Sequence, residues 1–219
     1  MTKNTLNQNG KYVQELINTI ESNFLFSNKP INRIQLNELD KIGGDQDKQA
    51  KLTKLEEQIN SIENCNLKKN SKRSILGDGN INSPLMIIGE APGEEEVNSG
   101  RSFQGDTGVL LKKMLLAINI NLEQIYSAYS INFRTPDDRK PTAQEIKRYS
   151  IFLKEHISII DPQIIILLGS TAMEAVMTLN NKISDERGQW KEIILKNKTY
   201  PLIVTFSPSY LIRFPDKKK

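Results

Sequence analysis

The sequence predicts a three-layer α/β fold, in which helices cover both faces of a central, mostly parallel four-stranded sheet. Four short apolar runs have the length of β-strands, and they lie at residues 84–88, 125–131, 164–168 and 202–206. Helical patterns separate these runs, and strands that alternate with helices favour a parallel sheet with right-handed crossovers. Residues 164–168 read Ile-Ile-Ile-Leu-Leu, which is typical of a strand buried on both faces.

Residues 1–60 are predicted to form a polar helical N-terminal extension, and residues 61–219 the α/β domain. The extension is rich in Asn, Lys and Gln, and the segment that begins at Gly43-Gly44 separates two amphipathic stripes. The stripes are Tyr12, Leu16, Ile17 and Ile20, and then Leu52, Leu55, Ile59 and Ile62. The second stripe spans scarcely two heptads, so we expect a helix packed on the sheet rather than a coiled coil.

Three further helices are predicted within the α/β domain. The first covers residues 109–118, with Asp106 or Thr107 as its N-cap. The second runs to about residue 158 and starts with Thr142 and Glu145, which have the spacing of a capping box. The third covers residues 172–179 and is opened by Gly169-Ser170-Thr171, directly after the strand at residues 164–168.

The composition sets limits on the class of protein. Lys and Arg number 30 against 26 Asp and Glu, which gives a formal net charge of +4. This mild basic excess suits a phosphate-backbone partner and equally suits an ordinary lysine-rich composition. No apolar run approaches the roughly 20 residues of a membrane-spanning helix, so we expect a cytoplasmic protein with no membrane partner. Cys65 is the only cysteine in the sequence, which excludes an internal disulfide.

A candidate catalytic residue follows the first predicted strand. The motif Gly89-Glu90-Ala91-Pro92-Gly93 comes directly after the apolar run. Open α/β sheets bind their ligands at the carboxyl ends of the strands, so Glu90 has the position of an active-site carboxylate. The backbone amides of the same turn could hold a base or a phosphate. Glu94, Glu95 and Glu96 are expected to form a solvated turn.

Two more motifs complete the pattern. They are Gly100-Arg101-Ser102-Phe103-Gln104-Gly105, and Ser207-Pro208-Ser209-Tyr210-Leu211-Ile212-Arg213 after the last apolar run. Together with the motif at Gly89, they resemble the signature motifs of the uracil-DNA glycosylase superfamily. The resemblance covers residues 65–215 and is closest to family 4, in the variants found in alphaproteobacteria.

The resemblance implies an enzyme that flips uracil out of DNA and hydrolyses its N-glycosidic bond, as in base excision repair. Glu90 would be a catalytic carboxylate that orients water or balances the positive charge of the sugar. Phe103 would stack on the flipped base beside Gly89 and Ala91, although a core phenylalanine at a turn is the alternative. The implied DNA contacts are Pro92, Gly93, Ser170, Ser209, Leu211 as a wedge in the base stack, and Arg213. A helix N-cap is the alternative role of Ser170, and pairing with an acidic neighbour is that of Arg213.

The sequence departs from the family pattern at two positions of the implied pocket. Ser207 stands where the family has the histidine that donates to uracil O2, so it would be a weaker catalytic donor. Tyr129 stands where the family has the asparagine that reads the edge of the uracil, and its size puts uracil recognition in doubt. The only histidine, His156, falls in an amphipathic helix and is expected to be structural.

No cofactor and no metal are expected. Typical family-4 enzymes carry an iron–sulfur cluster, and its cysteine positions correspond here to Ile62, Cys65, Phe133 and Tyr149. One thiolate is left where a cluster needs four. Cys65 is therefore expected to be a small buried residue.

The function that we predict from the sequence is a uracil-DNA glycosylase-like DNA repair protein, with weakened activity. One alternative is a catalytically inactive DNA-binding homologue, because Ser207 and Tyr129 both replace expected groups. The other is a phosphate- or nucleotide-binding α/β protein of another type, although the sequence has no Gly-x-x-x-x-Gly-Lys-Ser/Thr loop. DNA that contains uracil is the expected partner, and the sequence indicates no protein partner.

Overall fold

The structure is a computed structural model that describes residues 33–178 and 181–218. The chain divides into two compact units, residues 1–41 and 42–219. The sheet and all the candidate site residues belong to the second unit, together with the part of helix α2 (Arg33–Asn60) that follows residue 41. The predicted stripe from Tyr12 to Ile20 and the predicted helix end at Leu179 lie outside the described residues.

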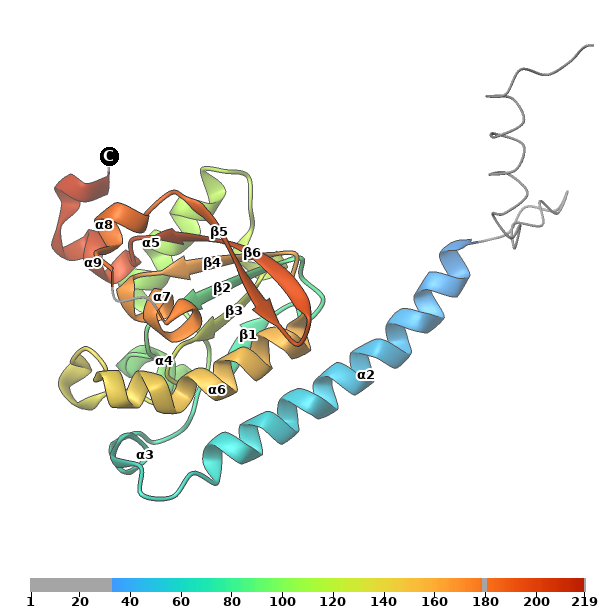
Figure 1. The fold of residues 1–219 in the computed structure, drawn as a ribbon, viewed down its shortest axis with the longest axis horizontal. Coiled ribbons are helices and arrows are strands. Elements are labelled where there is room, and N and C mark those ends of the chain that lie inside the picture. Colours follow the sequence, from blue (N-terminus) through green and yellow to red (C-terminus); the bar gives the residue numbers. More distant parts are fainter. Residues whose placement is uncertain (1–32, 179–180, 219) are drawn as a thin grey trace, which may run out of the picture. The chain divides into compact units, whose positions relative to one another are not determined.

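A six-stranded sheet with the order β1-β3-β2-β4-β6-β5 forms the centre of the second unit (Figure 1). The strands are β1 (Gly77–Gly79), β2 (Leu85–Gly89), β3 (Tyr126–Tyr129), β4 (Ile164–Leu168), β5 (Trp190–Leu195) and β6 (Lys198–Thr205). The four inner strands are parallel, and they are the strands that the sequence predicted. The predicted α/β class is therefore confirmed.

The sheet is wider than the predicted four strands because an antiparallel strand is added at each edge. β1 consists of Gly77, Asp78 and Gly79 and has no apolar residue that could signal a strand. β5 forms a hairpin with β6, in which Lys196 and Asn197 both have positive φ angles, as a tight type I′ turn requires. Its side chains are exposed or half-buried, so β5 lacked the apolar run on which the prediction relied.

Helices cover both faces of the sheet, as the predicted three-layer fold requires (Figure 1). On one face, α2, α6 (Ala143–Ile160) and α7 (Ser170–Met177) pack on a cluster that includes Met86 and Ile88 of β2. On the other face, α5 (Gly105–Leu116) packs on a cluster that includes Ile87. Leu52, Leu55 and Ile59 of α2 are buried in the first cluster, so the second predicted stripe does pack on the sheet.

Shorter elements complete the second unit. They are α3 (Asn66–Asn70), α4 (Glu94–Ser99), α8 (Ile183–Glu186), α9 (Pro208–Arg213), and the 3₁₀ turns η1 (Leu122–Gln124), η2 (Pro136–Asp138) and η3 (Pro215–Lys218). No helix among residues 33–178 and 181–218 is long and apolar enough to cross a membrane.

The observed helix starts agree only in part with those predicted from the sequence. α6 has the predicted capping box, in which Thr142 and Glu145 each accept a hydrogen bond from the backbone N–H of the other. α5 begins earlier than predicted, and Gln104 is its N-cap instead of Asp106 or Thr107. α2 continues through Gly43-Gly44, where a break was predicted. A glycine in a helix costs only about 1 kcal/mol, so neighbouring residues can outweigh it.

His156 is buried inside the fold, as its predicted structural role requires. Only 1% of its surface is exposed, and its Nε2 lies 2.9 Å from the hydroxyl of Tyr126 on β3. Burial lowers the pKa of His156 from 6.5 to about 3, because the charged imidazolium would lose its hydration. The folded protein therefore keeps His156 neutral.

We predict that the protein loses stability as the pH falls below about 6.5. The unfolded chain protonates His156 there while the folded chain does not, so the free energy of unfolding falls by up to about 1.4 kcal/mol per pH unit. The decline stops only near pH 3, where the folded form also takes up the proton. Thermal unfolding between about pH 6.5 and 5 isolates this effect, because carboxylates titrate below that range.

The matched variant is His156→Gln, which keeps a polar partner for Tyr126 and has no imidazole to titrate. We expect its stability to be nearly flat over the same pH range. Equal pH slopes for the wild type and His156→Gln would contradict the prediction.

Candidate active site

A cavity of about 400 Å³ opens at the edge of the sheet where the parallel strands end. The register of the sheet pairs Gly89, the last residue of β2, with Tyr129, the last residue of β3. Loops that leave this edge carry the motifs singled out in the sequence, so distant parts of the chain meet there. Most of the predicted site residues line this cavity: Gly89, Glu90, Ala91, Pro92, Gly93, Phe103, Tyr129, Ser207, Ser209 and Arg213.

Glu90 is fixed in the cavity wall by its neighbours. Its side chain is half-buried, and one carboxylate oxygen accepts a hydrogen bond from Thr171 Oγ1 at 2.6 Å. Its backbone carbonyl accepts from the amide of Ile131 at 3.1 Å. Thr171 is fully buried in α7, and no pattern in the sequence pointed to it. Glu90 can thus face a ligand with its orientation already set.

Ser207 caps a helix and also lines the cavity. It is the N-cap of α9, and its hydroxyl oxygen accepts a hydrogen bond from the amide of Tyr210 at 3.2 Å. The same hydroxyl lies 3.0 Å from the hydroxyl of Ser209. A capping hydroxyl keeps its own hydrogen to donate, so Ser207 can still give one hydrogen bond to a ligand.

Glu96 is the residue at this site that the sequence analysis placed wrongly. The predicted solvated turn at Glu94 to Glu96 is instead the first turn of α4, and Glu96 is buried with 6% of its surface exposed. Its carboxylate accepts from the backbone amides of Gly93 at 2.9 Å and of Gln104 at 3.1 Å. The Gly93-x-x-Glu96 spacing is half of a capping box, and it was the signal available in the sequence.

Tyr129 closes the inner end of the cavity together with Phe103. Their rings are 5.0 Å apart between centroids and inclined by 33°. The hydroxyl of Tyr129 accepts from the amide of Phe103 at 2.8 Å and donates to Glu96 Oε1 at 3.3 Å. Burial and the nearby Glu96 raise the pKa of Tyr129 well above 10, so the hydroxyl keeps its proton.

Phe103 adopts a left-handed backbone conformation, which its surroundings must stabilise. Its φ angle is +50°, in the left-handed region that costs a non-glycine residue about 1–2 kcal/mol. Gly108 allows the loop to fold tightly, because a Cβ there would lie 1.9 Å from the carbonyl oxygen of Phe103. Such strain is common at ligand sites, where the surroundings determine the conformation.

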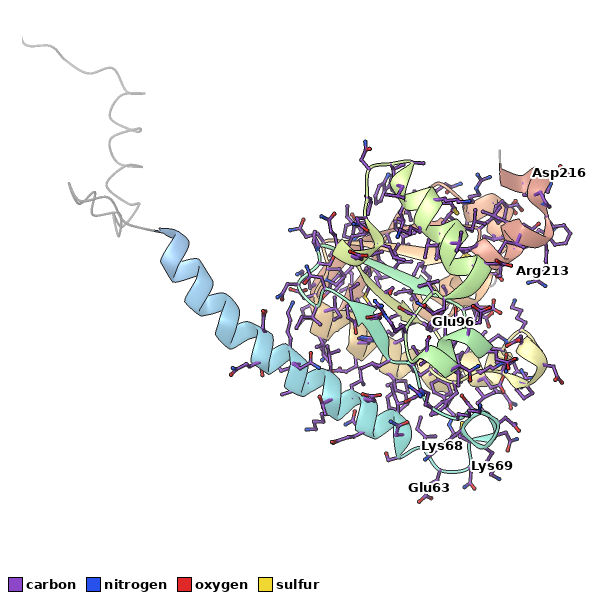
Figure 2. The ribbon with its side chains drawn as sticks, turned by 180° about the vertical axis from the view of Figure 1, so that it is seen from behind. Glu63, Lys68, Lys69, Glu96, Arg213 and Asp216 are labelled. Carbon is purple, nitrogen blue, oxygen red and sulfur yellow. The ribbon has the colours of Figure 1, made fainter. Side chains whose placement is uncertain are left out.

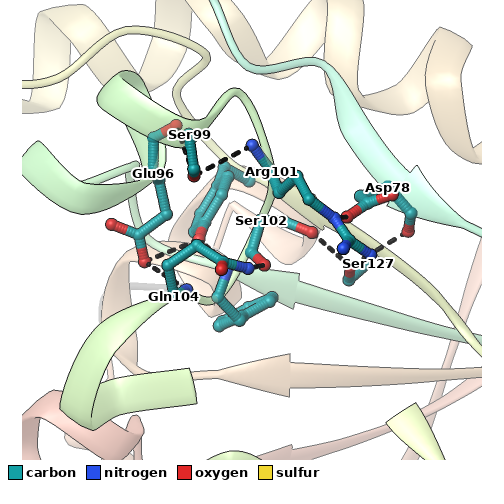
Figure 3. A network of polar contacts seen from close by, with 9 residues as sticks. Asp78, Glu96, Ser99, Arg101, Ser102, Gln104 and Ser127 are labelled. Carbon is teal, nitrogen blue, oxygen red and sulfur yellow. Dashed lines mark hydrogen bonds and ion pairs between the residues drawn. The ribbon is translucent and has the colours of Figure 1, made fainter. Parts of the chain in front are cut away.

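Polar contacts fix the loop on both sides of Phe103 (Figure 3). The Ser102 hydroxyl lies 2.5 Å from that of Ser127 on β3, and Gln104 is held by Glu96. Arg101 pairs with Asp78 of β1 at 3.0 Å. The predicted aromatic residue is therefore part of a rigid wall.

The cationic groups at the cavity differ in how far neighbouring carboxylates neutralise them. Arg139 donates two hydrogen bonds to Glu145, at 2.7 and 2.9 Å, and these lower the pKa of Glu145 to about 2. Arg213 is exposed on α9 (Figure 2) and makes no ion pair among the described residues. Its side chain donates instead to the carbonyl of Ser209 at 3.4 Å. Arg213 is therefore the cation that an anionic ligand can use.

Ser170 and Leu211 do not line this cavity. Ser170 lines an adjoining cavity of about 370 Å³, which shares Glu90, Ser207 and Arg213 with the first. Gly169 is the N-cap of α7, so Ser170 is the first helical residue, and its hydroxyl accepts from Lys140 Nζ at 3.3 Å.

Leu211 faces the protein, with 6% of its surface exposed, and cannot act as a wedge in this conformation. Its neighbour Ile212 is 39% exposed. Because α9 is a helix, adjacent residues point in different directions, which the motif alone does not indicate.

The positions implied for an iron–sulfur cluster lie together and do not fit one. Cys65, Phe133 and Tyr149 belong to one buried cluster, and Ile62 packs against it. The Cys65 sulfur lies 3.1 Å from the hydroxyl of Tyr149, and the rings of Tyr149 and Phe133 are 6.2 Å apart. A cluster needs thiolate ligands, and this set offers one among aromatic and aliphatic side chains.

Comparison with known proteins agrees with the geometry. Residues 76–219 match the profile of the family described as "Uracil DNA glycosylase superfamily". A "Type-4 uracil-DNA glycosylase" from Thermotoga maritima is 34% identical over 72% of this chain and 81% of its own length. One from Pyrobaculum aerophilum is 30% identical over 75% of this chain and 86% of its own. A "Type-5 uracil-DNA glycosylase" from the same organism is 28% identical over 46% of this chain and 51% of its own length.

We predict that Glu96→Gln lowers the free energy of unfolding by about 1–3 kcal/mol. The amide NH₂ that replaces one carboxylate oxygen cannot accept, so a buried backbone N–H loses its partner. Urea unfolding measures the change. The control is Glu95→Gln, the same substitution at the exposed preceding residue, which should stay within about 0.5 kcal/mol of the wild type. Similar losses in both variants would show that Glu96 does not hold the loops together.

We also predict that the purified protein contains no stoichiometric iron, because one cysteine cannot ligate a cluster alone. Elemental analysis after anaerobic purification and attempted reconstitution measures this. A preparation with about four irons per chain and broad visible absorbance would contradict it.

Proposed function

The chain belongs to the uracil DNA glycosylase superfamily, and from this we propose that it is a DNA repair protein that binds an extrahelical nucleotide and hydrolyses the N-glycosidic bond of uracil. The proposal rests on Glu90, whose carboxylate is held by Thr171 in the wall of the cavity. In this function the protein would act on DNA in the cytoplasm and use no metal.

The proposed reaction needs a base for water and support for a cationic sugar. Water attacks C1′ of the deoxyribose, the bond from C1′ to N1 breaks, and its electron pair leaves with the uracil. Glu90 orients the water, accepts its proton and offsets the positive charge that develops on the sugar. Arg213 and the hydroxyl of Ser209 face the same cavity, where they can contact the phosphates beside the nucleotide.

Hydrolysis should be slow because little in the cavity stabilises the negative charge on the leaving base. Negative charge develops on uracil O2, and a positioned donor there is worth about 10²–10³ in rate. Ser207 offers one neutral hydroxyl, and that hydroxyl also caps α9. The proposed enzyme thus has a carboxylate that offsets the positive charge of the sugar, and only a weak hydrogen-bond donor for the leaving base.

One observation favours the second candidate, a DNA-binding homologue without catalysis. The ring of Tyr129 packs on Phe103, and its hydroxyl accepts a hydrogen bond from the Phe103 amide and donates one to Glu96. The polar groups at the inner end of the cavity therefore already have hydrogen-bond partners. A phosphate- or nucleotide-binding protein of another type is not favoured, because the match to the superfamily covers most of the second unit.

The test is release of uracil from a single-uracil oligonucleotide under single-turnover conditions. We expect slow release by the wild type, and a loss of roughly 10²-fold or more in Glu90→Gln. Ser207→His should raise the rate by about 100-fold, because it adds an imidazole donor. The control is Ser207→Asn, which keeps a good N-cap and adds no imidazole.

Each outcome separates the two candidates. Uracil release that depends on Glu90 supports the enzyme. If Ser207→His and its double variant with Tyr129→Asn both fold, bind DNA and release no uracil, the protein is the non-catalytic homologue.

A further inference from the structure

Tyr129 fills the inner end of the cavity with an aromatic ring and a hydrogen-bonded polar group, as a bound base would. Its ring lies against Phe103 with a centroid separation of 5.0 Å and an inclination of 33°. Offset aromatic pairs and stacked bases share this kind of geometry. Only 3% of Tyr129 and 7% of Phe103 are exposed, so almost no free aromatic surface is left for another ring.

The polar end of Tyr129 is as well satisfied as its ring. It accepts one hydrogen bond from the Phe103 amide and donates one to Glu96, and Glu96 also holds the amides of Gly93 and Gln104. A base that replaced the ring would have to break both contacts of the hydroxyl. It would also have to find space for a large side chain that is now buried.

The backbone at Gly89 lies directly against the rings of Phe103 and Tyr129 and limits their movement. A Cβ added at Gly89 would lie 2.9 Å from Phe103 Cζ and 3.0 Å from Tyr129 Cδ1. Both rings therefore rest directly on the end of β2, where only a glycine fits. Tyr129 is enclosed by Gly89, Phe103 and Glu96, as a bound ligand would be.

The part of the cavity that stays open has a different chemical character. Its lining includes Glu90, Ser207, Ser209 and Arg213, which are a carboxylate, two hydroxyls and a guanidinium. These groups can hydrogen-bond to the hydroxyls of a sugar and pair with a phosphate. None of them presents the aromatic face on which a base would stack.

We propose that Tyr129 is an internal substitute for the flipped base, and that the open part of the cavity takes a deoxyribose phosphate without a base, so that the protein binds abasic sites in DNA in preference to uracil. The inference rests on the DNA-binding part of the proposed function and does not require hydrolysis. An abasic nucleotide enters without displacing Tyr129. A uracil nucleotide binds only the fraction of molecules in which Tyr129 has moved away, and its affinity falls by that fraction.

The experiment compares duplexes that differ at one central nucleotide: thymidine, 2′-fluoro-2′-deoxyuridine and the abasic analogue tetrahydrofuran. The fluorine slows hydrolysis, so the uracil duplex stays intact during the measurement. Dissociation constants are measured by fluorescence anisotropy at one fixed salt concentration. For the wild type we expect the abasic duplex to bind at least about tenfold more tightly than the uracil duplex, a difference of about 1.4 kcal/mol.

Variants of Tyr129 assign this preference to its ring. Tyr129→Asn empties the inner end, so uracil affinity should rise and the preference should fall to about threefold or less, while abasic affinity stays the same. Tyr129→Phe keeps the ring and should keep most of the preference. Tyr126→Phe is the matched control, because Tyr126 is a buried tyrosine of the same strand whose hydroxyl contacts His156. We expect it to keep the wild-type ratio.

The outcomes distinguish this inference from the proposed function. A wild type that binds uracil DNA as tightly as abasic DNA, or more tightly, overturns the inference and leaves the proposed function intact. An abasic preference that persists in folded Tyr129→Asn also overturns it. Preference for abasic DNA without any uracil release supports the inference and contradicts only hydrolysis. If neither lesion binds more tightly than undamaged DNA, the proposed function fails and the inference fails with it.

Discussion

The buried carboxylate of Glu96 is the interaction on which the shape of the cavity depends. It joins the start of α4 at Gly93, the loop at Gln104 and the end of β3 at Tyr129. Figure 3 shows its contact with Gln104. A buried carboxylate is costly unless hydrogen-bond donors satisfy it, and here each donor comes from a different segment. The same contacts that stabilise the charge therefore hold the segments in one arrangement, which includes the left-handed backbone of Phe103.

This arrangement explains why the cavity has two unlike ends. At the inner end, the phenol of Tyr129 supplies both the ring that covers Phe103 and the hydroxyl that reaches Glu96. At the outer end, Glu90, Ser209 and Arg213 line open space. Under the proposal made above, tyrosine in place of the family's asparagine would change what can enter the cavity. The affected property is selectivity, because a ligand must compete with a side chain that is already in place.

The sequence predicted those features that depend on local pattern. The parallel strands, the capping box of Thr142 and the position of Glu90 at a strand end all follow from apolar runs and turn residues. It could not predict features that depend on long-range contacts. The Gly93-x-x-Glu96 spacing indicates that Glu96 caps a helix, but its burial depends on the loop at Gln104 and the hydroxyl of Tyr129, which close over it. Thr171 contacts Glu90 across 81 positions of the chain, and Leu211 turns inward only because α9 packs on the domain.

Binding and catalysis are physically separable in this cavity. In the proposed function, binding a sugar and its phosphates would use the outer groups, which line the open cavity and include Glu90, held by Thr171. Cleaving the N-glycosidic bond also requires that charge on the leaving base be stabilised at the inner end. The phenol of Tyr129 at that end already donates to Glu96, and Ser207 in the open part of the cavity offers a single neutral hydroxyl. Charge stabilisation by the phenol would have to break its contact with Glu96, whereas the Ser207 hydroxyl accepts the capping hydrogen bond and keeps its hydrogen to donate. In the proposed function, cleavage would therefore be limited more severely than recognition of the DNA.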